Sequence, residues 1–431
     1  MERDKINELI AWKNNPARKP LIVRGARQVG KTWLLKEFGN RYYDKLIYIN
    51  FEEATQLQAL FQNDFDIERI IRTLQIYSQT QIIPENTLII FDEIQSIERG
   101  LTALKYFCEN APQYQIIAAG SLLGMGLHSN HSFPVGKVNF MDLRPLSFFE
   151  FLKANGESLL IESILKSEWD TVTIFHEKLI EYLRIYLYVG GMPEVVNTYI
   201  QTKDISSVRK VQRDILNSYE ADFSKHAPYE IIPRIQMIWQ SIPSQLSKEN
   251  KKFIYGMIRE GARAKDFELA IQWLVDYGLL LKTHRVSKPD MPLIAYQDLA
   301  VFKLFLLDVG LLSAMSQLDI RTVIEGNRIF TEFKGAQTEQ YVMQELRVAE
   351  DIYIGYWTNE RSTAEVDFVV QQQGLIFPIE VKAETNIKAK SFRLFCEKYQ
   401  PSKAYRTSLK TFHTESWMEN LPLYAIGTVW K

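Results

Sequence analysis

The sequence contains few cysteines, no long apolar run and no marked excess of positive or negative charge. The 431 residues include two cysteines, Cys108 and Cys396, too few for a disulfide framework or a zinc ligand set. No apolar run approaches the roughly 18 residues of a membrane span, and the first five residues lack the apolar core of a signal peptide. The chain has 51 Lys and Arg residues and 52 Asp and Glu residues, so its net charge does not indicate a nucleic-acid partner. We therefore expect a cytoplasmic protein with no membrane partner.

Three regions with different residue patterns follow one another along the chain and together predict an α/β fold class. In residues 1–150, short apolar runs alternate with amphipathic stretches, which predicts parallel strands joined by crossover helices. In residues 151–320, apolar residues recur at three- and four-residue intervals, which predicts mostly helices. In residues 321–431, one amphipathic helix over Gly335–Val348 precedes further strands. The predicted strands are Pro20–Arg24, Lys45–Phe51, Leu88–Phe91 and Tyr114–Ala119 in the first region and Tyr353–Trp357, Glu365–Gln371 and Leu375–Lys382 in the last.

The most specific motif follows the first predicted strand and fits the phosphate-binding pattern G-x-x-x-x-G-K-[ST]. Gly25 and Gly30 permit backbone angles that turn successive N–H groups toward phosphate oxygens. Lys31 places a positive charge beside the β and γ phosphates, and the Thr32 hydroxyl is a hard oxygen ligand for Mg²⁺. A glycine turn that binds nothing is the alternative, but a buried strand before the motif and a helix after it favour a nucleotide site. The candidate binding residues are Gly25, Ala26, Arg27, Gln28, Val29, Gly30, Lys31 and Thr32.

Two further strand ends supply polar residues for the same site. The run Leu88–Phe91 ends in Asp92 and Glu93; Asp92 is expected to hold Mg²⁺ and Glu93 to polarise the attacking water. The alternative is an ordinary solvated strand end. Ser121 follows the next strand and is a candidate γ-phosphate sensor, although it could instead cap the helix that follows. Lys31 and Glu93 are thus the candidate catalytic residues, and ATP with Mg²⁺ is the expected cofactor pair.

The sequence resembles the AAA-type ATPases of bacteria and archaea that carry a C-terminal domain of unknown function. The resemblance covers nearly the whole chain and implies the same roles for Lys31, Thr32, Asp92, Glu93 and Ser121. The segments that carry it are Ile22–Phe38, Ile89–Gln95, Ala119–Leu123, Phe133–Val138, Leu143–Phe151 and Tyr188–Val195.

A cationic residue that reaches the γ-phosphate is less well defined by this resemblance. Lys137 stands where many relatives have an arginine, and a lysine there would act as a point charge without the bidentate fork of arginine. Arg144 is a second candidate for the same role.

A helix–turn–helix pattern occupies the middle region. It predicts a helix over Asn250–Arg259, a turn at Gly261, a helix over Lys265–Tyr277 and then a wing-like hairpin near Arg285–Pro292. Basic residues between positions 248 and 265 favour a winged helix that contacts DNA, so DNA is a candidate partner. The alternative is a packing module with solvated charges, because acidic residues dilute the basic ones.

The last region contains an Asp-x(n)-Glu-x-Lys pattern on two predicted strands. Residues two apart share one face of a strand, so Glu380 and Lys382 lie together. Asp367 comes from the preceding strand and Glu339 from the helix before it. Carboxylates that hold Mg²⁺ and a lysine that orients a water are what phosphodiester cleavage needs. The pattern resembles the PD-(D/E)xK nuclease superfamily, with Val366 in place of the usual proline; the alternative is a charged strand edge.

These observations predict a P-loop parallel-sheet domain, a helical middle with a winged-helix-like module, and a nuclease-like α/β domain. The expected function is Mg²⁺-dependent ATP hydrolysis coupled to a nuclease-like, DNA-interacting C-terminal domain. The catalytic residues there would be Glu380 and Lys382, and the metal ligands of the whole chain Thr32, Asp92, Glu339, Asp367 and Glu380. The alternative is a nucleotide-dependent switch or scaffold whose C-terminal domain binds nucleic acid or protein without cleavage. Oligomer formation is left open.

Overall fold

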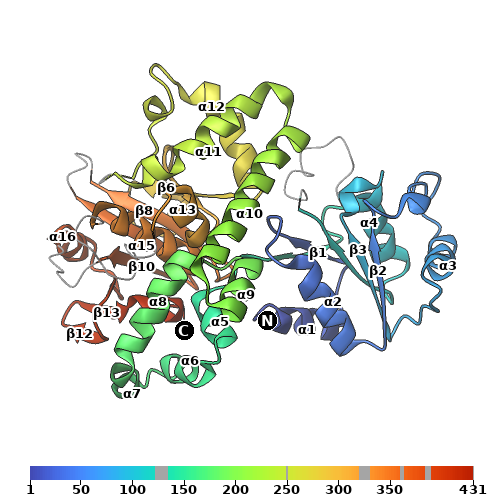
Figure 1. Ribbon diagram of the computed structural model, residues 1–431, viewed down its shortest axis with the longest axis horizontal. Helices are drawn as coiled ribbons and strands as arrows, with labels where there is room; N and C mark the ends of the chain where they lie inside the picture. The colour runs from blue at the N-terminus through green and yellow to red at the C-terminus, as the bar shows by residue number, and fades with distance from the viewer. Residues whose placement is uncertain (122–133, 249–250, 320–330, 360–363, 384–389, 431) are drawn as a thin grey trace. The chain divides into compact units, whose positions relative to one another are not determined.

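A computed structural model describes residues 1–121, 134–248, 251–319, 331–359, 364–383 and 390–430. The chain forms two compact units (Figure 1). The first contains Met1–Arg144 with Asp276–Gly278, and the second contains Pro145–Val275 with Leu279–Lys431. No helix among the described residues is long and apolar enough to cross a membrane.

The first unit contains a five-stranded sheet in the order β2-β3-β4-β1-β5, with every strand parallel to its neighbours. Helices surround the sheet (Figure 1), and α3 and α4 bury Ile70, Leu74 and Leu104 in the same core as Ile47 and Ile89 of the strands. The predicted parallel sheet with crossover helices is therefore confirmed. The elements are α1 (Ile6–Asn14), β1 (Leu21–Arg24), α2 (Lys31–Tyr42), β2 (Lys45–Asn50), α3 (Ile67–Ser78), β3 (Thr87–Asp92), α4 (Gly100–Asn110), β4 (Gln115–Ala119) and β5 (Asn139–Asp142).

The second unit is built on an eight-stranded mixed sheet in the order β12-β13-β11-β10-β9-β8-β6-β7. Strands from the predicted middle region, β6 and β7, thus lie in one sheet with strands of the predicted last region. The three predicted strands of that last region are found within about one residue of their expected ends. The strands are β6 (Leu280–Val286), β7 (Gln297–Leu306), β8 (Tyr353–Thr358), β9 (Glu365–Gln372), β10 (Leu375–Val381), β11 (Tyr405–Ser408), β12 (His413–Glu415) and β13 (Met418–Pro422).

Helices make up most of residues 148–276, as the spacing of apolar residues predicted. A hydrogen-bonded capping box between Ser147 and Glu150 begins the first of them. The helices of this unit are α5 (Phe148–Ala154), α6 (Ser158–Leu165), α7 (Trp169–Ile174), α8 (His176–Val189), α9 (Pro193–Thr202), α10 (Ile205–His226), α11 (Ile232–Leu246), α12 (Ala264–Asp276), α13 (Val309–Met315), α15 (Thr331–Leu346) and α16 (Lys390–Tyr399).

The Gly190-Gly191 pair joins α8 to α9 against a buried carboxylate. Gly191 donates its backbone N–H to Asp308 Oδ2 at 2.6 Å, and a Cβ at Gly190 would meet Asp308 Oδ1 at 2.2 Å. Since φ of Gly190 is +75°, a side chain there would be both strained and blocked. A Cβ at Gly191 would lie 2.1 Å from the Leu146 carbonyl oxygen, so both positions of the pair require glycine.

One predicted helix is wrong. Among the described part of Asn250–Arg259, only the short 3₁₀ helix η5 (Tyr255–Met257) is found. Phe253 instead donates its backbone N–H to Phe302 O of β7 at 2.8 Å. Ile254 exchanges two hydrogen bonds with the Gln245 side chain. These partners hold the backbone extended, so the apolar spacing of the segment does not make a helix. The second predicted helix is confirmed as α12, with Phe267, Ala270, Ile271 and Leu274 buried; position 250 lies outside the described residues.

Candidate functional site

The glycine-rich loop lies at the carboxyl end of β1 and leads directly into α2. Gly30 has φ +93°, a conformation that favours glycine. A Cβ at Gly25 would lie 2.2 Å from the Leu143 carbonyl oxygen, so glycine is required there too. Both glycines are thus needed for the backbone conformation of the loop, and their contact with phosphate stays a prediction.

Lys31 is buried at the start of α2 and spans the loop. Its Nζ donates to the carbonyl oxygens of Gly25 at 2.8 Å and Ala26 at 2.9 Å. Burial lowers the pKa of Lys31 to about 8, partly opposed by Glu93 and Asp92. A bound anion would favour the charged form of this amine. Lys31 therefore has the position and electrostatic environment of a phosphate-binding lysine.

Asp92 ends β3 and meets the first residues of α2. Thr32 donates its hydroxyl to Asp92 Oδ2 at 2.7 Å, so the two expected Mg²⁺ ligands are in contact. The Tyr48 hydroxyl of β2 donates to the same oxygen at 2.8 Å. Burial and the negative charge of Asp92 both raise the pKa of Tyr48, which keeps the phenol protonated as a donor. Hydroxyl and carboxylate oxygens are the donors that Mg²⁺ prefers, so these residues fit that ion.

Glu93 and Ser121 also come together, from the ends of β3 and β4. The Ser121 N–H donates to Glu93 Oε2 at 3.4 Å, and the Gln95 amide donates to the same oxygen. The Ser121 hydroxyl accepts a hydrogen bond from Arg27 Nε at 3.3 Å. Glu93 is itself in the left-handed region, at φ +49°, which turns its side chain away from the strand direction. The predicted residues of the loop and of both strand ends thus form one polar cluster.

Sequence reasoning missed two residues of this cluster, Tyr48 and Gln95. Tyr48 lies in a strand whose alternation reads as ordinary packing, and only the parallel pairing of β2 with β3 brings it to Asp92. Gln95 follows Glu93 by two residues in the sequence, but it belongs to no motif that would have marked it as a site residue.

The two candidate γ-phosphate cations have other partners. Lys137 Nζ lies 2.9 Å from Glu109 Oε1 of α4, and this hydrogen bond raises the pKa of Lys137. Arg144 Nη2 lies 4.0 Å from Asp142 Oδ2. Neither contact tests the proposed role, which stays a prediction.

In the second unit, Asp367, Glu380 and Glu339 lie within electrostatic reach of one another. Asp367 Oδ2 accepts the Val381 N–H at 2.8 Å, and Lys382 Nζ lies 2.5 Å from Glu380 Oε1. Burial and the neighbouring Glu339 and Glu380 raise the pKa of Asp367 well above its ordinary value. Burial also raises the pKa of Glu380, although Lys382 opposes the rise. The residues of the sequence pattern therefore lie close together in the structure.

Two lysines that the sequence analysis did not assign to this site enter the same cluster. Lys251 forms a buried ion pair with Glu339 Oε1. Lys303 of β7 is completely buried, pairs with Glu365 and lies 3.7 Å from Glu339 Oε2. Burial alone would raise the pKa of Glu339, but Lys251 and Lys303 hold it below its ordinary value. We call Lys251, Lys303, Glu339, Glu365, Asp367, Glu380 and Lys382 the charged cluster.

This donor set does not fit the divalent metal that the nuclease interpretation needs. Within the described ranges, no three acidic, histidine or cysteine side chains are grouped so that they could hold a metal ion. Ammonium groups of Lys251 and Lys303 already neutralise the carboxylate that the helix contributes. The predicted metal ligands Glu339, Asp367 and Glu380 are close together but are not arranged as a coordination site.

The five-stranded parallel sheet and the loop at the end of β1 define the first unit as a P-loop nucleotide-binding domain. Residues 17–152 match the family model described as "AAA domain". The rest of the chain matches two families of undescribed role: residues 180–322 a "Domain of unknown function (DUF8612)" and residues 334–426 a "Domain of unknown function (DUF4143)". Residues 17–152 thus match an AAA domain model, and two later stretches match families whose names assign no activity.

Comparison with curated proteins gives no match. Among solved structures, the Walker-type ATPase PABY2304 of Pyrococcus abyssi matches with a TM-score of 0.46 and 16% identity, over 73% of this chain and 95% of that one. The Orc1 protein of Aeropyrum pernix, solved with DNA, matches at a TM-score of 0.30 and 12% identity, over 74% and 93%. Cdc6p from Pyrobaculum aerophilum matches at 0.25 and 11%, over 75% and 93%. All three TM-scores lie below 0.5, so these likenesses do not assign a function.

Proposed function

We propose that the chain binds ATP with Mg²⁺ and hydrolyses it. The observation that carries this proposal is the contact of Thr32 with Asp92 beside the buried ammonium of Lys31. In a P-loop site, Lys31 would bind the β and γ phosphates, while the Thr32 hydroxyl and Asp92 would hold the Mg²⁺ that neutralises their charge. The bound ion would supply charge stabilisation during phosphoryl transfer. Glu93 would orient the attacking water, and Ser121 would contact the γ-phosphate.

Lys31→Ala is expected to weaken the binding of ATP by about ten- to hundredfold, because one charged hydrogen-bonding group is worth roughly 1.5–3 kcal/mol. Isothermal titration calorimetry with ATP and Mg²⁺ measures this change. Lys45→Ala is a matched control, since Lys45 lies at the amino end of β2 and its ammonium group donates to the Gln81 carbonyl oxygen at 3.2 Å, outside the phosphate loop. Equal affinities of Lys31→Ala and the wild type would contradict the proposed phosphate site.

For the second unit we propose the non-cleaving alternative, a nucleotide-dependent switch whose C-terminal domain binds a partner. The specific observation is the pairing of Lys251 and Lys303 with Glu339. These ammonium groups compensate the negative charge that a bound metal ion compensates in a nuclease. Cleavage by Glu380 and Lys382 is the competing proposal, supported by their shared position beside Asp367.

We expect the purified protein to leave supercoiled plasmid intact with Mg²⁺ or Mn²⁺, with and without ATP, in a gel assay for nicking. Because the charged cluster lacks a metal-binding arrangement, Glu380→Gln should behave like the wild type in this assay. Nicking that requires both a divalent ion and Glu380 would overturn the non-cleaving proposal and support the nuclease one. The proposal of ATP hydrolysis is unaffected by either outcome.

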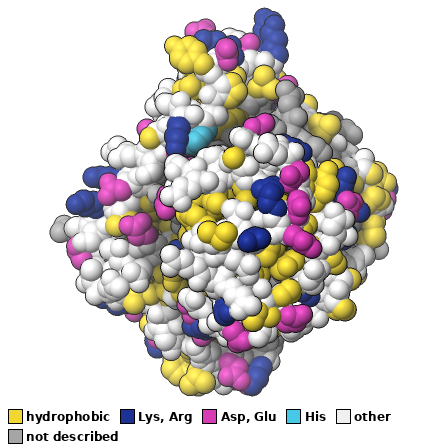
Figure 2. Space-filling model, turned by 90° about the vertical axis from the view of Figure 1, so that its right-hand side faces the viewer, with side chains coloured by type: hydrophobic (Ala, Val, Ile, Leu, Met, Phe, Trp, Pro, Cys, Tyr) yellow, Lys and Arg dark blue, Asp and Glu magenta, His cyan; other side chains and the backbone are white. Residues whose placement is uncertain are grey.

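DNA as the partner stays a prediction, and the charge distribution gives it limited support. Of the basic residues between positions 248 and 265, Lys251 is buried in its pair with Glu339, whereas Arg259 and Arg263 remain exposed. On the face drawn in Figure 2, Lys and Arg side chains are interspersed with Asp and Glu rather than gathered in one patch. A DNA-binding surface would need such a patch.

A further inference from the structure

A pocket of about 360 Å³ lies between α12 and the β6–β7 hairpin, within the second unit. One wall is the solvent-facing side of α12, and the opposite wall comes from β6 and the irregular part of β7. Residues 299–301 of β7 have no partner residue on β6, because the strand register shifts between His284 and Arg285. Such a bulge re-aims side chains and is frequent beside binding sites. The volume is in the range of small-ligand pockets.

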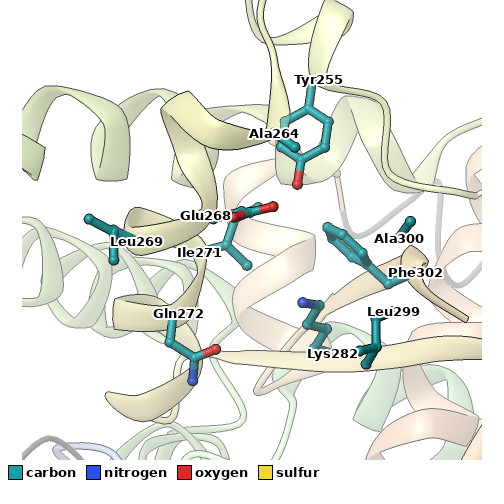
Figure 3. A pocket seen from close by; sticks show the side chains of 10 residues that line it. All are labelled: Tyr255, Ala264, Glu268, Leu269, Ile271, Gln272, Lys282, Leu299, Ala300 and Phe302. Carbon is teal, nitrogen blue, oxygen red and sulfur yellow. The ribbon is translucent and has the colours of Figure 1, made fainter. Parts of the chain in front are cut away.

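The interior combines aromatic rings with a single inward cation. Figure 3 shows the Tyr255 hydroxyl, the Glu268 carboxylate, the Lys282 ammonium and the Phe302 ring directed toward one another across the pocket. The Tyr255 and Phe302 rings have centroids 6.4 Å apart in an edge-on arrangement. Ring edges and faces of this kind bind apolar and planar groups.

Lys282 has no ion pair or hydrogen bond with any residue in the described ranges. Its Nζ lies over the Phe302 ring, 4.3 Å from the ring centroid. Burial lowers the pKa of Lys282, and Glu268 offsets this only in part. His284, two residues further along β6, has its pKa lowered by burial and by the charge of Lys282. The pocket therefore holds a half-buried positive charge without a counter-charge in contact, a situation that an anion would relieve.

The composition of the rim argues against a nucleic acid as the occupant. Leu269 and Leu299 are each more than 70% exposed, and the acidic Glu268 also lines the pocket. A phosphate backbone is bound by several cations together, whereas this rim is apolar and acidic around one lysine. A single carboxylate attached to an apolar group matches both the lone cation and the rings.

We propose that this pocket binds an aromatic or branched apolar group that carries one carboxylate, either a free organic acid or the C-terminal residue of a polypeptide. The carboxylate would pair with Lys282, and the apolar part would lie against Phe302 and Tyr255.

Titration with 3-phenylpropionate and its neutral amide, followed by saturation-transfer NMR on the full-length protein, tests the proposal. We expect the acid to bind at least tenfold more tightly than the amide. Lys282→Met should remove the difference, and Lys282→Arg should keep it, since both arginine and lysine pair with a carboxylate. Equal binding of acid and amide by the wild type, or an unchanged preference in Lys282→Met, would overturn the proposal.

A tripeptide ending in phenylalanine, with a free or an amidated C-terminus, distinguishes the two sources of the carboxylate. Tighter binding of the free-ended peptide than of 3-phenylpropionate assigns the site to polypeptide ends, and the reverse order assigns it to small organic acids. Failure of all carboxylates to bind would exclude both. Glu268→Gln serves as a matched control at the opposite wall, where loss of an acidic side chain should preserve or strengthen binding. Far-ultraviolet circular dichroism and thermal unfolding of each variant check that the second unit, which contains the pocket, stays folded.

Discussion

Glu93→Gln is expected to lower the rate of ATP turnover by about 10²–10⁴-fold while ATP binding remains close to that of the wild type. The magnitude is what a positioned general base contributes to a proton transfer in the transition state. Glutamine keeps the size of the side chain and can still accept hydrogen bonds from the Ser121 N–H and Gln95, which Glu93 Oε2 accepts now. It cannot take a proton from water. Phosphate release under saturating ATP and Mg²⁺ measures the change.

Calorimetric titration with ATP separates this effect from a binding defect, because the Glu93 side chain accepts its hydrogen bonds from Gln95 and Ser121, outside the phosphate loop. Gln95→Ala is the matched variant: it removes a donor to Glu93 but leaves the carboxylate in place. We expect Gln95→Ala to retain most of the turnover. If Glu93→Gln hydrolysed ATP at the wild-type rate, the water-orienting role would have to pass to another residue of the cluster.

Four of the five strands of the first unit were predicted from sequence, for a physical reason, whereas β5 (Asn139–Asp142) was not. Buried parallel strands are continuous apolar runs, so Leu88–Phe91 had no competing interpretation. The glycine loop is specified by backbone angles and close approach, which only glycine satisfies at Gly25 and Gly30. Tyr48 was not predicted as a site residue, because its contact with Asp92 depends on the pairing of β2 with β3, which the local sequence does not show.

The second unit could be predicted only in part, because pairing across long sequence distances decided its details. The apolar spacing of residues 250–259 favoured a helix, but the Gln245 side chain and Phe302 hold Phe253 and Ile254 in extended backbone. The positions of the carboxylates on β9 and β10 followed from strand alternation. Lys251, which pairs with Glu339, lies 88 residues earlier in the chain, and no local pattern links the two residues.

Loss of one partner of the Lys251–Glu339 pair is expected to destabilise the second unit by about 3–5 kcal/mol, the usual cost of leaving one buried charge unpaired. Lys251→Met leaves the Glu339 carboxylate with Lys303 alone, at 3.7 Å, and Glu339→Gln leaves Lys251 buried without its carboxylate. Urea denaturation followed by tryptophan fluorescence measures each change. Lys288→Met is the control, because its pair with Asp290 is about half exposed and contributes little.

The double variant Lys251→Met/Glu339→Gln distinguishes a structural role of the Lys251–Glu339 pair from a role in metal binding. If the two ammonium groups and the carboxylate form a closed structural network, removing both partners should cost clearly less than the sum of the single variants, because no unpaired charge remains. A charged cluster built to hold a metal would behave differently. Lys251→Met would then gain stability from millimolar Mg²⁺ or Mn²⁺, since the ion would replace the lost ammonium at Glu339 and bind only the folded state. We expect no such gain, and its appearance in Lys251→Met but not in the double variant would restore the metal-dependent interpretation of the C-terminal domain.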